Sequence, residues 1–343
     1  MASRAPNPFR TLFELAATGL ALFAAGVGVA SQLGRWIMKF DILDHGAVLW
    51  LAVSLIALVL TAFFRRGWGQ AGVAVLALIG VACAADLIIP EFTRPRTALA
   101  AADAPCQIKI VSFNAWEENS DAAKVAAWIA TQHPTLVVVV EPSDKLGAAI
   151  AASTGLPTWK GDGAVMANAT PFLSNQRSWA GRFMPGSASE VMWDTIEVLP
   201  DLPITVLGVH AGWPIPARAG WSRDVRLAAI LDQEDRSSTL MVGDFNSSEW
   251  SFRQRRADDL FAIERRDKAI LSWPARIPFR NKPDFPFPWM PIDHVYAGEN
   301  WRLVSIERGP RLGSDHYPLV TRLAWVGPVR SERMRQACAV KPL

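Results

Sequence analysis

Long apolar runs dominate the N-terminal part of the chain, whereas the remainder alternates short apolar and polar stretches. The runs Leu15–Leu33, Ala47–Phe64 and Gly67–Ala85 contain no charged residue. As a helix, each would span roughly 28 Å, close to the thickness of a bilayer's hydrocarbon core. A cleaved signal peptide would explain only the first run, and three uncharged helices are difficult to bury in one soluble core. The pattern predicts a membrane region over residues 1–90, with transmembrane helices at about 12–33, 47–64 and 67–89.

The charges around these runs indicate an orientation. Arginines precede the first helix and fill the second connection, at Arg4, Arg10, Arg65 and Arg66. The tendency of positive charge to stay inside places both segments in the cytoplasm, although Arg94 and Arg96 after the third helix oppose it. We therefore expect a multi-pass protein of the cell (inner) membrane whose chain after Pro90 is extracytoplasmic.

The pattern changes beyond residues 91–106, a proline- and alanine-containing stretch that we interpret as a linker. Alternating apolar segments predict strands at 107–113, 135–140, 190–198, 203–209, 238–242, 292–297, 302–307 and 317–325. Helices are predicted over 121–132 and from a Ser222 cap to about 233. Many strands with helices between them favour an α+β domain, a two-sheet sandwich with helices outside. The basic tail, residues 327–343, is predicted to be mobile.

One predicted strand ends in an unusual set of polar residues, Gly243, Asp244 and Asn246. Residues two apart on a strand share a face, so this carboxylate and amide would point the same way where the strand ends. The glycine would let another group approach the backbone closely. Such a pair suits a divalent cation beside a phosphate. A simple turn is the alternative, because the same residues are common turn formers.

Polar groups also stand at the ends of five other predicted strands. They are Asn114, Glu141, His210, the pair Asp293-His294 and the series Ser314-Asp315-His316. Any one of them could belong to a turn or to the surface. Their repetition in this order favours a single site built where the strands end.

The ordered series resembles the endonuclease/exonuclease/phosphatase superfamily, the metal-dependent phosphoesterases related to pancreatic deoxyribonuclease. It consists of Phe113-Asn114, Glu141, His210, Gly243-Asp244-Phe245-Asn246, Ile292-Asp293-His294 and Ser314-Asp315-His316. The three spans followed by this domain are similar to a bacterial branch that includes glycopeptide-resistance membrane phosphatases. The resemblance implies a catalytic domain at 107–326 with a four-layer α/β/β/α sandwich. It also implies Mg²⁺ or Mn²⁺ at the sheet edges.

The resemblance assigns metal ligands by motif position. Glu141 would be the principal carboxylate, with Asp315 and Asn114 near the same ion. The bound cation would draw charge from the phosphate as it is attacked by water.

The resemblance also assigns catalytic groups. Asp244 would orient or deprotonate the attacking water, and Asn246 would hold that water or a phosphate oxygen. His316 would be fixed in its tautomer by Asp293, and His210 would donate to a non-bridging phosphate oxygen. The identity of the general base stays open. His133 and His294 match no motif position and are interpreted as structural.

Charge and aromatic residues bear on the substrate. Basic and acidic residues nearly balance, 35 to 32, whereas a nucleic-acid-binding protein usually carries a clear basic surplus. Trp213, Phe287 and Trp289 lie near proposed site residues and could contact the membrane or the substrate, with ordinary packing as the alternative. We expect the lipid bilayer as a partner and a phosphorylated lipid or small molecule as substrate. An extracytoplasmic nuclease or phosphodiesterase and a non-catalytic membrane-bound binding module are the alternatives, and no protein partner can be inferred.

Two cysteines, Cys106 and Cys338, flank the predicted domain. In an oxidising compartment they could pair and join its two ends, and two free thiols are the alternative.

Overall fold

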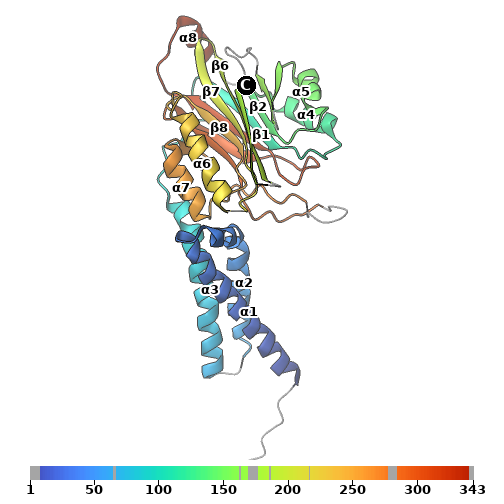
Figure 1. Ribbon diagram of the computed structural model, residues 1–343, viewed down its shortest axis with the longest axis vertical. Helices are drawn as coiled ribbons and strands as arrows, with labels where there is room; N and C mark the ends of the chain where they lie inside the picture. Colours follow the sequence, from blue (N-terminus) through green and yellow to red (C-terminus); the bar gives the residue numbers. More distant parts are fainter. Residues whose placement is uncertain are drawn as a thin grey trace, which may run out of the picture. The chain divides into compact units, whose positions relative to one another are not determined.

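The computed structural model describes residues 8–64, 67–161, 164–168, 177–184, 187–215, 217–276 and 284–339. Arg4, Arg65 and Arg66, which carried the orientation argument, lie outside these ranges. The chain forms two compact units (Figure 1). The first is Met1–Arg94 with Glu249–Arg253, and the second is Pro95–Ser248 with Gln254–Leu343.

Three long helices form most of the first unit. They are α1 (Pro8–Gln32), α2 (Ala47–Thr61) and α3 (Trp68–Thr93), and two short 3₁₀ segments follow α1, η1 (Leu33–Arg35) and η2 (Met38–Gly46). With those segments included, three helical stretches within the described ranges are long and apolar enough to cross a membrane, Pro8–Arg35, Met38–Thr61 and Trp68–Thr93. The third helix continues through Pro90, beyond its predicted end.

These helices place small residues inside and large apolar residues outside. Half of the buried positions in these helices are alanines, among them Ala17, Ala21, Ala24, Ala57, Ala77 and Ala84. Large side chains such as Leu15 and Val59 are 65% and 63% exposed. At Gly80 a Cβ atom would lie 2.4 Å from Ser54 Oγ, so the close packing of α3 requires glycine there. Small residues between helices and apolar surface outside are typical of membrane-spanning bundles.

A short segment from the second half of the chain completes the first unit. The backbone N–H of Arg253 donates to Asp41 Oδ1 at 2.9 Å, and the rings of Phe92 and Trp250 stack with centroids 6.5 Å apart. The predicted division into consecutive ranges did not include this segment, because no local pattern marks it.

The described residues of the second unit form two six-stranded sheets. The first sheet has the order β11 (Trp301–Arg308), β12 (Leu319–Trp325), β1 (Gln107–Asn114), β2 (Leu136–Val140), β4 (Ala164–Asn168), β3 (Thr158–Gly161). The second has the order β5 (Arg177–Met184), β6 (Ser187–Leu199), β7 (Leu202–His210), β8 (Leu240–Asp244), β10 (Asp293–Ala297), β9 (Glu264–Arg265). The pairs β1–β2 and β7–β8 are parallel, and the others are antiparallel.

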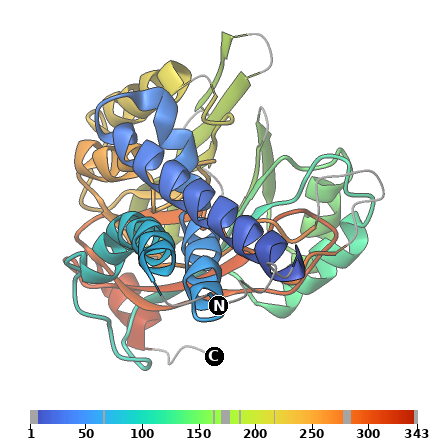
Figure 2. The same cartoon turned by 90° about the horizontal axis from the view of Figure 1, so that it is seen from below.

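Helices cover the outer face of each sheet. The helices α4 (Ala122–Thr131) and α5 (Leu146–Thr154) lie on one side of the sandwich, and α6 (Ala217–Leu231) and α7 (Phe252–Phe261) lie on the other (Figures 1 and 2). Val137 packs outward with the α4 residue Ile129, whereas the next residue, Val138, packs inward against the second sheet. This strand is apolar throughout because both of its faces are covered. The predicted four-layer α/β/β/α sandwich is confirmed.

Some local predictions were wrong. The helix α6 begins at Ala217, so Ser222 lies inside it and caps nothing. The stretch predicted to be a linker packs on the second unit, where Thr97 Oγ1 donates to Glu264 Oε2 at 2.8 Å and the Ala100 N–H donates to the Leu303 carbonyl. The tail predicted to be mobile contains α8 (Glu332–Ala339).

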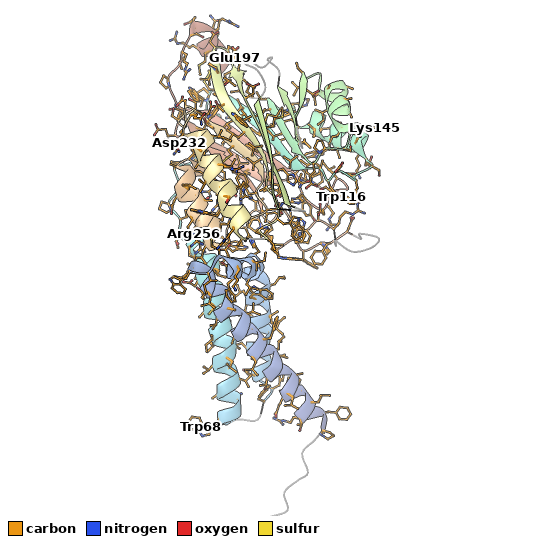
Figure 3. All side chains as sticks on the ribbon, in the orientation of Figure 1. Trp68, Trp116, Lys145, Glu197, Asp232 and Arg256 are labelled. Carbon is orange, nitrogen blue, oxygen red and sulfur yellow. A yellow bond between two sulfur atoms is a disulfide. The ribbon has the colours of Figure 1, made fainter. Side chains whose placement is uncertain are left out.

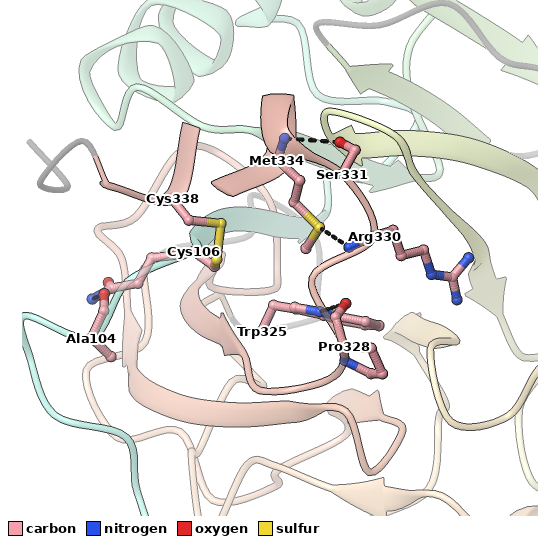
Figure 4. The surroundings of a disulfide bond; sticks show 9 residues. Ala104, Cys106, Trp325, Pro328, Arg330, Ser331, Met334 and Cys338 are labelled. Atoms are coloured by element: carbon pink, nitrogen blue, oxygen red, sulfur yellow. Dashed lines mark hydrogen bonds between the residues drawn. A yellow bond between two sulfur atoms is a disulfide. The ribbon is translucent and has the colours of Figure 1, made fainter. Parts of the chain in front are cut away.

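The helix α8 is covalently tied to the start of β1 (Figure 4). A disulfide joins Cys106 to Cys338, closing a sequence separation of 232 residues. Cys338 and Met334 are buried in the core between the sheets. The structure therefore contains the bond for which the sequence left two alternatives open.

Candidate functional site

Strand register gathers the predicted residues at one edge of each sheet. Asn114 ends β1 opposite Val140 on the parallel strand β2, so Glu141 follows at the same edge. In the second sheet His210 pairs with Asp244 across the parallel strands β7 and β8. The strand β10 is antiparallel and starts where β8 ends, so Asp293 pairs with Asp244 as well.

Hydrogen bonds connect the two edges. Asn114 Nδ2, from the first sheet, donates to Asp244 Oδ2 of the second at 3.0 Å and to Glu141 Oε1 at 3.2 Å. His210 Nε2, from the second sheet, lies 2.7 Å from Glu141 Oε1. The structure thus brings these four residues into one polar cluster between the sheets. Trp116, labelled in Figure 3, donates its backbone N–H to Asn114 Oδ1 at 3.0 Å and so fixes the other end of that amide.

A buried group of two carboxylates and one imidazole adjoins this cluster. His316 Nδ1 donates to Asp293 Oδ2 at 2.8 Å, and His316 Nε2 lies 3.6 Å from Asp244 Oδ2. One potential ligand atom from each of the three side chains lies within 4.8 Å of the other two. The Asp293 carboxylate therefore orients the imidazole ring and leaves Nε2 facing Asp244.

The loop before β12 is attached to the end of β1. Ser314 Oγ donates to the Asn114 carbonyl at 2.7 Å and accepts the His316 N–H at 3.0 Å. This explains why a serine precedes the Asp315-His316 pair, since it holds both residues beside the first sheet.

Asn246 reaches Asp244 through a turn. Its φ is +46°, its N–H donates to Asp244 Oδ1 at 2.7 Å, and its Nδ2 donates to the Ala211 carbonyl at 2.6 Å. The strand ends at Asp244, so strand alternation does not align the two side chains. Both sequence interpretations contribute, because the turn itself brings the amide beside the carboxylate.

Gly243 has a different neighbour from the one its position suggested. Its φ is +144°, and a Cβ atom would lie 2.1 Å from the Val209 carbonyl oxygen. The predicted close approach exists, but the approaching group is the adjacent strand β7. The glycine thereby sets the spacing of the strands that carry His210 and Asp244.

Glu141 is held in its charged form. Burial raises the pKa of this carboxyl, but hydrogen bonds from His210 and Asn114 and the nearby charges of His210 and His316 outweigh burial and lower the pKa to about 2. The side chain remains 30% exposed, so a cation from solvent can reach it.

The buried group holds protons more tightly. Burial raises the pKa of Asp244 to about 6, and the Asp293 charge adds to this while the His316 charge opposes it. Burial lowers the pKa of His316, but the charges of Asp293 and Asp244 outweigh it and raise the pKa to about 10. A carboxylate that titrates near neutral pH beside a protonated imidazole is suited to proton transfer.

The donor set fits a hard divalent cation. Glu141 and Asp315 offer partly exposed carboxylates, and Asp244 and Asp293 offer buried ones. Oxygen donors of this kind suit Mg²⁺ and Mn²⁺ better than soft metals. Asp315 adjoins the cluster, since its charge contributes to the raised pKa of His316.

Two residues near the site were missed from the sequence. Trp273 Nε1 donates to Asp315 Oδ2 at 3.2 Å. Arg223, on α6, is 1% exposed and donates from Nη1 to the Phe245 carbonyl at 3.2 Å, which supports the turn between Asp244 and Asn246. A charged residue at an inward position of an amphipathic helix was the available signal for Arg223, and nothing local marks Trp273.

The remaining predicted residues lie outside this cluster. Trp213 and Phe287 are 65% and 73% exposed. His294 is fully buried, with Nδ1 2.7 Å from Asp267 Oδ2 and Nε2 2.8 Å from the Ser247 carbonyl, in keeping with a structural role. His133 is exposed at the end of α4.

Comparison with known proteins places this geometry in context. Residues 111–316 match the Endonuclease/Exonuclease/phosphatase family. An endonuclease/exonuclease/phosphatase from Beutenbergia cavernae has a similar structure, with 18% identity, 65% of this chain and 72% of that chain covered, and a TM-score of 0.50. A mannosyl-6-phosphatase from Bacteroides thetaiotaomicron gives 11% identity, 64% and 100% coverage and a TM-score of 0.49. Sphingomyelinase C from Streptomyces griseocarneus gives 14% identity, coverage of 64% of this chain and 99% of that chain, and a TM-score of 0.45. No curated protein matches this chain.

Proposed function

Because this chain belongs to the endonuclease/exonuclease/phosphatase family, whose members are metal-dependent phosphoester hydrolases, we propose that it is a membrane-anchored phosphatase of a lipid or small envelope metabolite. The bond hydrolysed is a phosphate ester or pyrophosphate, and water is the nucleophile. The observation that carries the proposal is the junction of the two sheets, where Asn114 bridges Glu141 and Asp244 beside the His316–Asp293 pair.

Mg²⁺ or Mn²⁺ would be held by Glu141 and Asp315. When bound, it supplies positive charge that neutralises the phosphate oxygens during attack. The predicted ligand Asn114 would instead hold the Glu141 carboxylate in place, because its Nδ2 donates to Glu141 and its amide oxygen accepts the Trp116 backbone N–H. The low pKa of Glu141 keeps that carboxylate available at all physiological pH values.

The buried residues supply orientation and proton transfer. Asp244 accepts a hydrogen bond from the attacking water and takes its proton, and Asn246 keeps the Asp244 carboxylate in place. His316, oriented by Asp293, presents Nε2–H to a phosphate oxygen and stabilises the charge that develops there. His210 positions the Glu141 carboxylate, because its Nε2 lies 2.7 Å from Oε1. A hydrogen bond from His210 to a phosphate oxygen stays a prediction.

Three features support a membrane lipid as substrate. The three apolar helices have the length and the outward-facing apolar side chains of membrane spans. The Cys106–Cys338 disulfide is compatible with an oxidising, extracytoplasmic location. The near balance of 35 basic and 32 acidic residues does not favour a nucleic acid. The substrate class is therefore a phosphorylated or pyrophosphorylated lipid of the cell envelope, and the chain falls in a membrane-anchored branch of the family.

Phosphate release tests this proposal. The purified full chain would be assayed in detergent with a panel of lipid phosphates, lipid pyrophosphates, sugar phosphates and plasmid DNA, with Mg²⁺, with Mn²⁺ and with chelator. We expect metal-dependent release from lipid substrates. Cleavage of plasmid alone would assign a nuclease instead, and no metal-dependent release from any substrate would favour a non-catalytic binding module.

A further inference from the structure

Four aromatic side chains form a continuous series beside the site, which we call the aromatic ladder: Trp273, Trp289, Phe285 and Phe287. Successive ring centroids are 5.7 Å apart for Trp273 and Trp289, 5.4 Å for Trp289 and Phe285, and 6.2 Å for Phe285 and Phe287. The interplanar angles are 78°, 88° and 83°, so each pair meets edge to face. Such contacts add to the stability of an aromatic cluster beyond the area it buries.

The ladder connects the site with solvent. At its inner end Trp273 Nε1 donates to Asp315 Oδ2 at 3.2 Å, and Asp315 is a proposed metal ligand. At its outer end Phe287 is 73% exposed. The intervening rings of Phe285 and Trp289 are partly exposed. An apolar group that entered along these rings would therefore end beside Asp315.

Backbone hydrogen bonds hold the ladder in shape. The N–H groups of Trp289 and Met290 donate to the Trp273 carbonyl at 3.0 and 2.9 Å, and the Phe285 N–H donates to the Ala275 carbonyl at 2.9 Å. Arg311 Nη2 donates to the Phe285 carbonyl at 3.0 Å. The surface is preformed, so an apolar molecule that covers it does not have to order the ladder first.

We propose that the aromatic ladder binds the hydrocarbon chain of a phosphorylated lipid whose phosphate lies beside the cation that Asp315 and Glu141 would hold. The inference rests on the proposed function and adds to it the residues that select the apolar part of the substrate. Covering Phe287 and its neighbours with a hydrocarbon chain removes apolar surface from water, which favours a long chain over a short one. Arg276 and Arg311 lie on either side of Asp284, at 3.9 and 3.8 Å, and their positive charges suit an anionic head group.

A stacked nucleobase is the main rival occupant, because aromatic side chains also bind single-stranded nucleic acid. Three apolar helices on the same chain and the nearly balanced charge favour the lipid. The two occupants would make different contacts with the ladder. A base stacks on the face of a ring, whereas an alkyl chain can cover apolar surface of any orientation.

Binding of matched phosphates tests the proposal on the full chain in neutral phosphatidylcholine nanodiscs with Mg²⁺. Dissociation constants would be measured by calorimetry for octyl phosphate, methyl phosphate and a 5′-phosphorylated thymidine dinucleotide. We expect the wild type to bind octyl phosphate about tenfold more tightly than methyl phosphate. Phe287→Ser should remove most of this difference, and Trp289→Ala should do the same. The control Val326→Ser, which also removes an exposed apolar side chain (51% exposed) but lies outside the ladder, should keep it.

Three results would overturn the proposal. They are equal or undetectable binding of the two alkyl phosphates, a Phe287→Ser variant that keeps the tenfold preference, and a substitution that weakens the dinucleotide more than octyl phosphate. Binding does not require turnover, so the two proposals can fail separately. Metal-dependent phosphate release without a chain-length preference would overturn the ladder alone, whereas the preference without any release would overturn the phosphatase alone.

Discussion

The site has a buried half and an exposed half that differ in what surrounds their charges. In the buried half the side chains of Asp244, Asp293 and His316 are 1%, 3% and 5% exposed. In the exposed half the side chains of His210 and Glu141 are 15% and 30% exposed. Both halves consist of carboxylates beside an imidazole, so residue type alone does not separate them.

The two halves differ in the direction in which the pKa values of their carboxylates are shifted. The buried group loses water and binds protons more tightly than it would in water, with the pKa of Asp244 raised to about 6 and that of His316 to about 10. Glu141 has the opposite shift, to about 2, because hydrogen bonds to its charged form outweigh partial burial. Under the proposed function, proton transfer would therefore fall to the buried half, and capture of cation and phosphate would fall to the exposed half.

The largest expected effect is the loss of the buried carboxylate. Asp244→Asn keeps the shape but removes the proton acceptor, so we expect kcat to fall by about 10³-fold with the fold retained. Rates of phosphate release and circular dichroism would be measured together. Asp232→Asn, at a surface carboxylate that is 69% exposed, should retain wild-type kcat. Near-normal turnover of Asp244→Asn would show that this carboxylate is not the acceptor.

A change in the exposed half should act on the metal instead. Glu141→Gln removes the charge of the principal proposed ligand, and we expect the dissociation constant for Mn²⁺ to rise by about 100-fold. Titration followed by electron paramagnetic resonance would measure it. Glu299→Gln, an exposed carboxylate outside the site, is the control. An unchanged affinity for Mn²⁺ would remove Glu141 from the ligand set.

A smaller effect on metal affinity is expected at Trp273, which donates a hydrogen bond to the proposed ligand Asp315. Trp273→Phe keeps the ring in the aromatic ladder but removes the N–H that holds Asp315 Oδ2, so the dissociation constant for Mn²⁺ should rise by about tenfold. The same titration checks it, with Trp128→Phe on α4 as control. If affinity stays at the wild-type value, the indole does not position Asp315.

The smallest effect on turnover is expected at the disulfide, which lies at the opposite end of β1 from Asn114. Replacing Cys106 and Cys338 together by serine should lower the free energy of unfolding of the second unit by about 2–4 kcal/mol while kcat stays within about twofold of wild type. Denaturant unfolding under non-reducing conditions would measure it, with Cys83→Ala as control. Equal stability of the double variant and the wild type would contradict the expected role.

Prediction from the sequence succeeded where the information is local. The apolar run Leu136–Val140 and the uncharged spans follow directly from which residues are apolar. Polar residues at strand ends marked Asn114, Glu141, His210, Asp244 and Asp293, because a buried strand that ends in a polar group must meet water or a ligand there. The catalytic and metal-binding roles of these residues stay predictions.

Contacts between distant segments could not be predicted in this way. The tail was expected to be mobile, yet Met334 and Cys338 lie in the core. The prediction failed because two apolar residues in a basic stretch are too weak a pattern to indicate burial. Arg223 and Trp273 each act through one hydrogen bond to a residue far along the chain. Such bonds depend on the placement of whole elements, which no local pattern encodes.

The sequence by itself determined the three apolar helices, the alternation of strands and the polar residues at the strand ends, because hydrophobic burial acts on each element through its own residues. Only the tertiary structure decided that Asp244 and His316 are buried while Glu141 stays partly exposed, since burial depends on which neighbours cover a side chain. It also decided that Gly243 accommodates the neighbouring strand and that a left-handed turn brings Asn246 to Asp244. The division of the site into two halves is thus a property of packing, although every residue in it can be read from the chain.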